Sequence, residues 1–143
     1  MKIFIASDHA GFRLKKELIQ FLEKEKKMDI QDFGTDSEQS MDYPDVVHPL
    51  CKSLENQKDT LGILICGSGN GVCMTANKYP FIRAALCWNE ELASLARKHN
   101  NANVLCLPAR FINYELAKNM VIEFLTSDFE GGRHEIRVNK IKC

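Results

Sequence analysis

The sequence lacks an excess of charge of either sign, since its 143 residues include 19 basic and 19 acidic side chains. This balance argues against a nucleic acid or an anionic membrane surface as the main partner, because such surfaces attract strongly basic proteins. A long apolar run is also absent near the start, where residues 3–6 are too few for a signal peptide or a membrane span. No linker, repeat or low-complexity segment interrupts the chain, so we expect a single domain over residues 1–143.

Paired cysteines are absent as well. The six cysteines are scattered, with no CxxC pair and no spacing typical of a metal site. Several lie inside apolar runs, such as Cys87 in AALCW and Cys106 in NVLCLP, which is typical of reduced core residues in a cytosolic protein. We therefore expect a cytoplasmic protein that uses neither a metal nor another cofactor.

The most informative stretch is LGILICGSGNG, residues 61–71. An apolar run ends at Cys66, glycines then alternate with small polar residues, and VCMTANK follows as a predicted helix. A buried strand, a glycine turn and a helix start surround an anion with backbone N–H groups, and glycine lets a ligand approach the backbone closely. Cys66 would face this anion site, where a thiol is a candidate base or nucleophile. The alternative is a tight turn beside a buried, inert cysteine.

Several familiar phosphate- and nucleotide-binding patterns are missing from this loop. It contains no GxxxxGK[ST], and its glycines fall as GxGxG rather than GxGxxG. A cysteine phosphatase loop needs an arginine six residues after the cysteine, where this chain has Val72. A receiver-type switch needs an aspartate where Cys66 stands. The loop therefore indicates an anion site of another kind.

Predicted strands and helices alternate along the whole chain. Hydrophobic periodicity predicts strands at 2–7, 28–34, 61–66, 82–88 and 101–109, and helices at 12–27, 45–56, 72–78, 90–99, 114–127 and 130–141. Pro44 is expected to open the second helix, whose pattern Pro49 complicates, and Asn89 and Asn113 are expected to cap later helices. This alternation predicts an α/β protein with a three-layer α/β/α, doubly wound, Rossmann-like fold around a five-stranded parallel sheet.

Two polar pairs flank these elements. Asp8 and His9 directly follow the first strand, and they would face the glycine loop if the first and third strands were neighbours. The alternative interpretation is that this pair is only a helix cap and a surface histidine. His99 and Asn100 end a helix, where such residues are commonly structural.

Arginines suggest where a phosphate would bind. Arg133 and Arg137 are four residues apart and therefore share one face of a helix. That face is either simply solvated or, with the preceding glycines and His134, able to bind a phosphate. Arg110 follows the fifth strand, at the edge of the sheet where ligands bind.

Several stretches together carry a resemblance to a known family: SDHAG (7–11), DYPD (42–45), CGSGNG (66–71), NK (77–78), RAALCWNEELASLARKHNNANVLCLPAR (83–110) and GGRHEIRV (131–138). They resemble the ribose-5-phosphate isomerase B family over nearly the whole chain. The resemblance implies a homodimer or dimer of dimers that interconverts an aldose phosphate and its ketose phosphate without a metal. Ribose 5-phosphate and ribulose 5-phosphate of the pentose phosphate pathway are the usual pair. A hexose 6-phosphate of the allose or galactose type and a non-catalytic sugar-phosphate-binding module remain as alternatives.

The resemblance also implies a role for each site residue. Cys66 would be the base that moves a proton between C2 and C1, because Val72 stands where other members carry a glutamate base. Ser68 would relay a proton between O1 and O2, and His99, assisted by Asp8, would open the sugar ring. Substrate contacts would come from Asp8, from the backbone of Gly67, Ser68, Gly69, Asn70 and Gly71, from Asn100, and from His9, Arg110, Arg133 and Arg137 at the phosphate, with Tyr43 and His134 as further candidates.

Helix geometry separates two of these residues. Cys66 ends the third strand, whereas His99 ends a helix that runs back antiparallel to the strands. His99 should therefore arrive near the opposite edge of the sheet, a strand length or about 17–20 Å away. If both residues act on one sugar, His99 must come from a partner chain, so we expect a homodimer with shared sites, possibly assembled into a tetramer.

Overall fold

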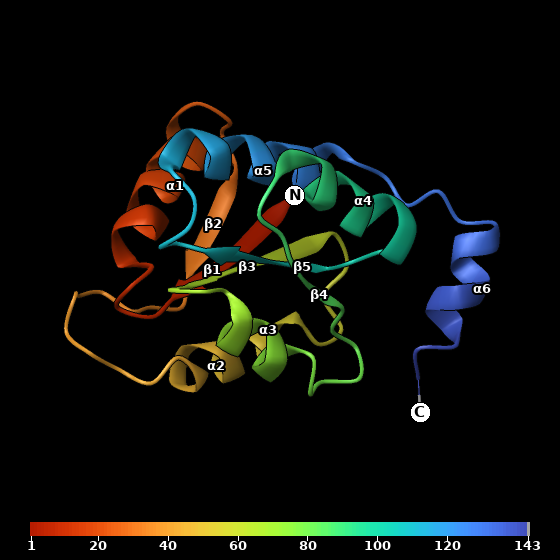
Figure 1. The fold of residues 1–143 in the computed structure, drawn as a ribbon, viewed down its shortest axis with the longest axis horizontal. Coiled ribbons are helices and arrows are strands. Elements are labelled where there is room, and N and C mark those ends of the chain that lie inside the picture. Colours follow the sequence, from red (N-terminus) through yellow and green to blue (C-terminus); the bar gives the residue numbers. More distant parts are fainter. Residues whose placement is uncertain (143) are drawn as a thin grey trace.

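The structure, a computed structural model that describes residues 1–142, contains five strands and six helices in that range (Figure 1). The strands are β1 (Lys2–Ser7), β2 (Asp29–Asp32), β3 (Thr60–Cys66), β4 (Ala84–Leu86) and β5 (Val104–Pro108). The helices are α1 (Phe12–Lys24), α2 (Pro44–Leu54), α3 (Asn70–Ala76), α4 (Glu90–Asn100), α5 (Tyr114–Thr126) and α6 (Arg133–Asn139). Every predicted element is present, with ends that shift by up to about three residues.

All strand pairs are parallel, and the strands lie in the order β2-β1-β3-β5-β4. From β1 the chain moves outward to β2 and then crosses back to β3 on the other side of β1. The strand order therefore reverses between β1 and β3, which is where open α/β sheets bind ligands. This arrangement confirms the five-stranded, doubly wound parallel sheet, and β5 lies between β3 and β4.

Helices cover both faces of the sheet. Figure 1 shows α1, α4 and α5 on one face and α2 and α3 on the other. The side chains of β1 alternate accordingly, because Ile3 and Ile5 join the core under α1 and α5 while Phe4 and Ala6 join the core over α2 and α3. The three-layer prediction is therefore confirmed. Helix α6 lies outside these layers, beside the end of α4 (Figure 1).

The helix ends follow mostly from local chemistry. Asn89 and Asn113 accept hydrogen bonds from the backbone N–H groups of Leu92 and Leu116 at 2.8 and 2.9 Å, so both predicted caps are confirmed. Pro44 opens α2 as expected, and the helix continues through Pro49. Helix α1 ends at Lys24, before the predicted 27, because the chain leaves the helix over the next residues and Lys27 takes a left-handed conformation. Among residues 1–142, no helix combines the length and apolar character needed to cross a membrane.

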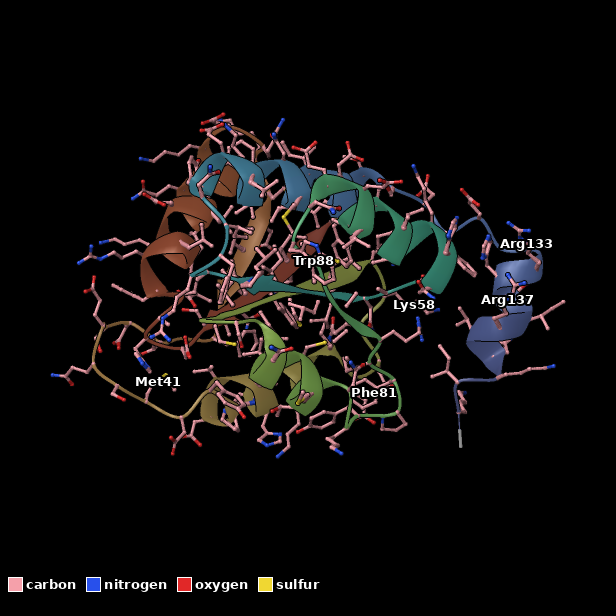
Figure 2. All side chains as sticks on the ribbon, viewed as in Figure 1. Met41, Lys58, Phe81, Trp88, Arg133 and Arg137 are labelled. Atoms are coloured by element: carbon pink, nitrogen blue, oxygen red, sulfur yellow. The ribbon has the colours of Figure 1, made fainter. Side chains whose placement is uncertain are left out.

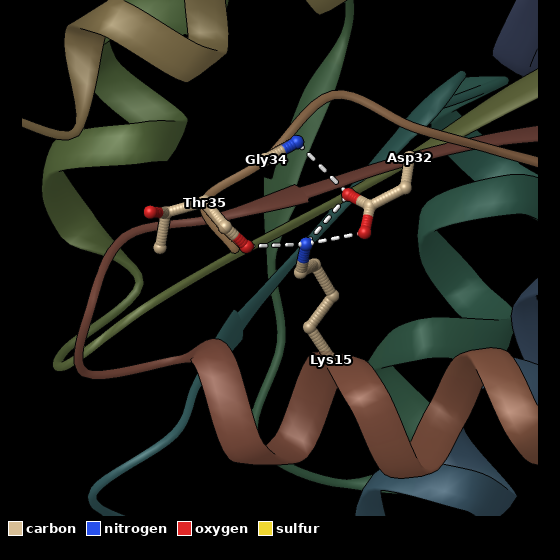
Figure 3. Close-up of polar contacts among 4 residues, drawn as sticks. All are labelled: Lys15, Asp32, Gly34 and Thr35. Atoms are coloured by element: carbon tan, nitrogen blue, oxygen red, sulfur yellow. Dashed lines mark hydrogen bonds and ion pairs between the residues drawn. The ribbon is translucent and has the colours of Figure 1, made fainter. Parts of the chain in front are cut away.

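A buried lysine holds the segment that follows β2 (Figure 3). The Lys15 ammonium, on a side chain with almost no exposure, donates hydrogen bonds to Asp32 Oδ1 at 2.6 Å and to the Thr35 carbonyl at 2.7 Å. Asp32 also accepts a bond from the Gly34 N–H at 2.9 Å. The same segment pairs with the end of β1, since the Ser7 N–H donates to the Gly34 carbonyl at 2.7 Å. These contacts fix the start of the long loop that leads to α2.

Candidate active site

The loops after β1 and β3 lie side by side, as the sequence predicts for neighbouring strands. The Asp8 N–H donates to the Ile65 carbonyl at 3.1 Å, one residue before Cys66. The buried Asp8 carboxylate accepts hydrogen bonds from the N–H groups of Ala10 and Gly11 at 2.9 and 3.1 Å. Asp8 therefore caps the turn before α1 and also stands at the edge where ligands bind. Its structural role as a cap and its predicted role in the site are compatible.

Arg110 and Tyr43 enclose the glycine loop from two sides. A Cβ on Gly67 would lie only 3.1 Å from Nη1 of Arg110, so the guanidinium rests on the loop backbone. The Arg110 N–H also donates to the Gly67 carbonyl at 3.0 Å. A Cβ on Gly71 would lie 2.4 Å from Cζ of Tyr43, so the phenol ring occupies the space that a side chain would need. Glycine at 67 and 71 is what lets these two side chains lie against the loop.

The middle of the loop turns sharply at the buried Gly69. Gly69 has a φ of 73°, a left-handed conformation that favours glycine, and its carbonyl accepts the first bond of α3 from Cys73. Ser68 is exposed, and its Oγ accepts a bond from the Asn70 N–H at 3.3 Å. Cys66 is only 4% exposed, at the bottom of this loop. The exposed hydroxyl and the buried thiol therefore stand on either side of one short turn.

His9 joins this group through the segment anchored by Lys15. Its Nδ1 accepts a hydrogen bond from the Met41 N–H at 3.2 Å, so a neutral His9 carries its proton on Nε2 and can donate from there. Sequence reasoning missed this contact, because nothing in the pattern of residues 35–43 says which backbone group meets His9. The loop before α2 thus contributes Tyr43 as a side chain and Met41 through its backbone.

A second group of polar side chains gathers where α4 meets α6. The rings of His99 and His134 stack with centroids 4.1 Å apart and planes 7° apart. The Glu130 carboxylate oxygen Oε2 lies 3.7 Å from Nε2 of each histidine. Burial lowers the pKa of His134, and the positive charges of His99 and Arg133 lower it further. Glu130 is a residue that sequence reasoning missed: it stands four residues before His134 in the predicted helix 130–141, but nothing in that spacing shows that it also faces His99.

The two groups lie at opposite ends of the strands. Cys66 pairs with Pro108 at the carboxyl end of β5, whereas the end of α4 meets the amino end, where the Ala102 N–H donates to Ala96. Five residues of β5 separate these levels, or about 16 Å at 3.3 Å per residue. Figure 2 agrees, because Met41 lies at one end of the molecule and Arg137 at the other.

The predicted site residues are therefore divided between two places. The carboxyl end of the sheet holds Asp8, His9, Tyr43, Cys66, Gly67, Ser68, Gly69, Asn70, Gly71 and Arg110. The α4–α6 end holds His99, Asn100, Arg133, His134 and Arg137, and Figure 2 shows both arginines on α6. Asn100 also lines a cleft of about 630 Å³ between α6 and residues 77–85, away from Cys66. One chain by itself does not assemble the whole predicted set.

The other cysteines differ in acidity. A hydrogen bond with the Cys106 thiol lowers the pKa of Cys73 to about 7, although burial acts in the opposite direction. Burial raises the pKa of Cys51 and Cys87 to about 12, and it raises that of Cys106 well above the usual value. Cys73 is also more exposed than Cys66, so it competes for any thiol reagent.

Comparison with known proteins covers almost the entire chain. Residues 3–141 match the family model described as Ribose/Galactose Isomerase. A probable ribose-5-phosphate isomerase B from Mycoplasma pneumoniae is 49% identical over 140 residues, which span 97% of this chain and 91% of the relative. The crystal structure of a ribose 5-phosphate isomerase from Thermotoga maritima is 51% identical, with a TM-score of 0.94 and coverage of 99% of this chain and 97% of that one. Ribose-5-phosphate isomerase B from Mycoplasma genitalium, solved with bound ribulose-5-phosphate, is 46% identical, with a TM-score of 0.93 and coverage of 98% and 93%.

Proposed function

The chain belongs to the ribose/galactose isomerase family, and we propose that it interconverts ribose 5-phosphate and ribulose 5-phosphate. Similar proteins are named as isomerases of this pair, and one was solved with the ketose product bound. The observation that carries the proposal is the Cys66 thiol at the switch point of the sheet, beside Asp8 and the glycine loop. The reaction belongs to the pentose phosphate pathway, and we infer that it takes place in the cytoplasm.

The proton transfers use groups at the glycine loop. The Cys66 thiolate removes the proton from C2 of the open-chain aldose, and the electron pair moves into an enediolate. The resulting thiol returns a proton to C1, while Ser68 carries a proton between O1 and O2. Backbone N–H groups from Gly67 to Gly71 hold the enediolate oxygens, and preorganised donors of this kind are often worth about 3–4 kcal/mol each. The proton taken from C2 is returned at C1, so the Cys66 thiolate is regenerated in each turnover.

The phosphate is bound by side chains from both groups of predicted site residues, one at the glycine loop and one on α6. His9 and Arg110 contribute from the chain that supplies Cys66, and Arg133 and Arg137 contribute from a second chain. The net charge of the protein is zero, so the positive field is local to these side chains rather than general. Charge-assisted hydrogen bonds from arginine to a phosphate are directional and comparatively strong, which positions the reacting carbons over the loop.

Ring opening requires His99 from a second copy of the chain. The separation of about 16 Å along β5 is far longer than an imidazole side chain, so His99 cannot serve Cys66 of its own chain. Helix α6 projects from the body of the molecule, and the side chains of Ile136 and Ile141 are 60% and 59% exposed, so they offer apolar surface that a partner chain could cover. A two-fold dimer that covers these side chains would complete two equivalent sites, each with Asp8 assisting the partner's His99 and with Asn100 on a sugar hydroxyl.

A coupled assay tests the proposal directly. Ribose 5-phosphate, allose 6-phosphate and galactose 6-phosphate are supplied separately, in the presence of a chelator, to the wild type and to Cys66→Ala. We expect turnover of the pentose phosphate without added metal and a loss of at least 10²-fold in the variant, since general-base catalysis contributes about 10²–10⁴-fold. A preference for a hexose phosphate would show that the substrate is a hexose phosphate rather than ribose 5-phosphate. Near-normal turnover by Cys66→Ala would remove the thiol as the base, and no turnover of any sugar would favour a binding module.

A further inference from the structure

Three metal-ligating groups converge where α4 meets α6, away from the glycine loop. The ligand atoms of His99, Glu130 and His134 all lie within 4.8 Å of one another. One oxygen, Oε2 of Glu130, lies 3.7 Å from Nε2 of each ring. Both distances exceed those of a hydrogen bond, so the carboxylate faces two imidazole nitrogens without bonding directly to either.

The spacing suits a small tetrahedral ion. Zinc binds histidine nitrogen at about 2.0–2.1 Å and carboxylate oxygen at about 2.0–2.2 Å, which places neighbouring ligand atoms roughly 3.3–3.4 Å apart. The two observed distances of 3.7 Å therefore need a contraction of only a few tenths of an ångström. The two histidine nitrogens lie within 4.8 Å of each other and must approach by up to about 1.5 Å. The side chains of His99 and Glu130 are 37% and 52% exposed, so they can make this adjustment while the buried His134 stays fixed.

The donor set favours a transition metal such as zinc over magnesium or calcium. Two imidazoles and one carboxylate form a ligand set that zinc uses when a fourth position stays open to water. Magnesium and calcium prefer oxygen ligands alone, so they should bind this cluster poorly. The His99 and His134 rings stack almost in parallel, and both present Nε2 to the same carboxylate. Since a metal lies in the plane of each imidazole that binds it, the more exposed His99 ring must turn out of the stack when zinc binds.

We propose that His99, Glu130 and His134 bind one zinc ion per chain and that this ion reversibly inhibits the isomerase. The inhibitory part rests on the proposed function, in which His99 moves protons during ring opening. A metal bonded to Nε2 of His99 occupies the lone pair that would accept a proton, so ring opening stops while zinc is bound. The ion is an inhibitor of this reaction and takes no part in it.

Equilibrium dialysis of the chelator-treated protein against zinc alone tests the site without reference to activity. Glu130→Ala removes one ligand, and Glu135→Ala removes an exposed carboxylate of α6 as the matched control. We expect one zinc per chain in the wild type and in the control. Affinity should fall by at least about 10-fold in Glu130→Ala, since even outer partners of metal ligands account for 10–100-fold. Equal affinity in the two variants would overturn the site.

Thiols are the competing explanation for any zinc effect, because Cys66 and Cys73 also bind soft metals. Cobalt(II) substitution separates the two, since thiolate ligands add a charge-transfer band in the near ultraviolet and nitrogen and oxygen ligands do not. We expect no such band in the one-to-one cobalt complex. A thiolate band that persists in Glu130→Ala would place the metal on cysteine and overturn the proposal.

Activity then tests the inhibitory part. Zinc should suppress turnover of ribose 5-phosphate over the same concentration range as binding, a chelator should restore it, and Glu130→Ala should resist by the same factor as its loss of affinity. If zinc binds and turnover stays complete, the proposed inhibition is refuted but the zinc site stands. Zinc binding by a protein that turns over no sugar, even with chelator, would contradict the proposed function and leave the site intact.

Discussion

Gly71→Ala should damage the glycine loop because the ring of Tyr43 occupies the space that the new methyl group needs. A Cβ at this position would lie 2.4, 2.6 and 2.8 Å from three atoms of the Tyr43 ring. Carbon atoms in contact lie about 3.5–4.0 Å apart, so the ring must move by roughly 1 Å or more. The φ of Gly71 lies outside the left-handed region, so alanine suits the backbone and the effect is purely steric.

The size of the effect follows from the exposure of the ring. Overpacking costs about 1–3 kcal/mol in a closed core, but Tyr43 is 37% exposed and can swing toward solvent. We therefore expect a loss of about 1 kcal/mol in the free energy of unfolding. Activity should suffer more, because a displacement of about 1 Å in a catalytic loop can lower the rate by as much as 10²-fold.

A double-mutant cycle gives the test. Urea unfolding and kcat/KM are measured for Gly71→Ala, Tyr43→Ala and the double variant. Removing the ring relieves the clash, so the double variant should be more stable than the sum of the single effects predicts, by about 1 kcal/mol. Additive stabilities together with unchanged kcat/KM in Gly71→Ala would refute the close packing of Tyr43 on the loop.

Three further predictions address the anchor, the thiols and the phosphate. Lys15→Met should lower the free energy of unfolding by about 2–3 kcal/mol, because the lost bonds involve a buried charge while water can still hydrate the half-exposed Asp32; a change below about 1 kcal/mol in urea unfolding would contradict this. Iodoacetamide should label Cys73, followed by peptide mass, at a rate that rises with pH and reaches its midpoint at about pH 7, because the pKa of this thiol is lowered to about 7. A midpoint at about pH 8.5 or above would contradict the hydrogen bond from Cys106. Arg137→Ala should raise the KM for ribose 5-phosphate by roughly 10- to 150-fold, equivalent to about 1.5–3 kcal/mol; equal inhibition of wild type and variant by inorganic phosphate would show that Arg137 is not a phosphate ligand.

Most of the fold could be predicted from the sequence because each element has a clear local signal. The apolar run that ends at Cys66 can only be a buried strand, and the asparagines at 89 and 113 have the chemistry of caps. The strand order could not be predicted in full. β4 and β5 have similar apolar patterns, and only tertiary packing inserts β5 beside β3.

The site was predicted in part for the same reason. Residues that follow a strand, such as Asp8 and the glycine loop, must lie at the carboxyl edge of a parallel sheet, so their proximity follows from topology. The position of His99 at the other end follows from the direction of its helix. The four-residue spacing of Glu130 and His134 is visible in the sequence, but the contact of Glu130 with His99 is not. That contact depends on how an irregular segment crosses back to α4, where the Glu130 N–H donates to the Lys98 carbonyl, and no sequence period encodes it.

Subunit complementation tests the central claim most directly, namely that Cys66 of one chain and His99 of another act on one sugar phosphate. Cys66→Ala and His99→Ala are each expected to be inactive as purified. When they are mixed and allowed to exchange subunits, each hybrid dimer has one site with both substitutions and one with neither. About a quarter of all sites should then recover under random two-fold pairing, and ribose 5-phosphate should be turned over at about that fraction of the wild-type rate. Activity that stays at background while mass measurement confirms hybrid dimers would contradict the shared site.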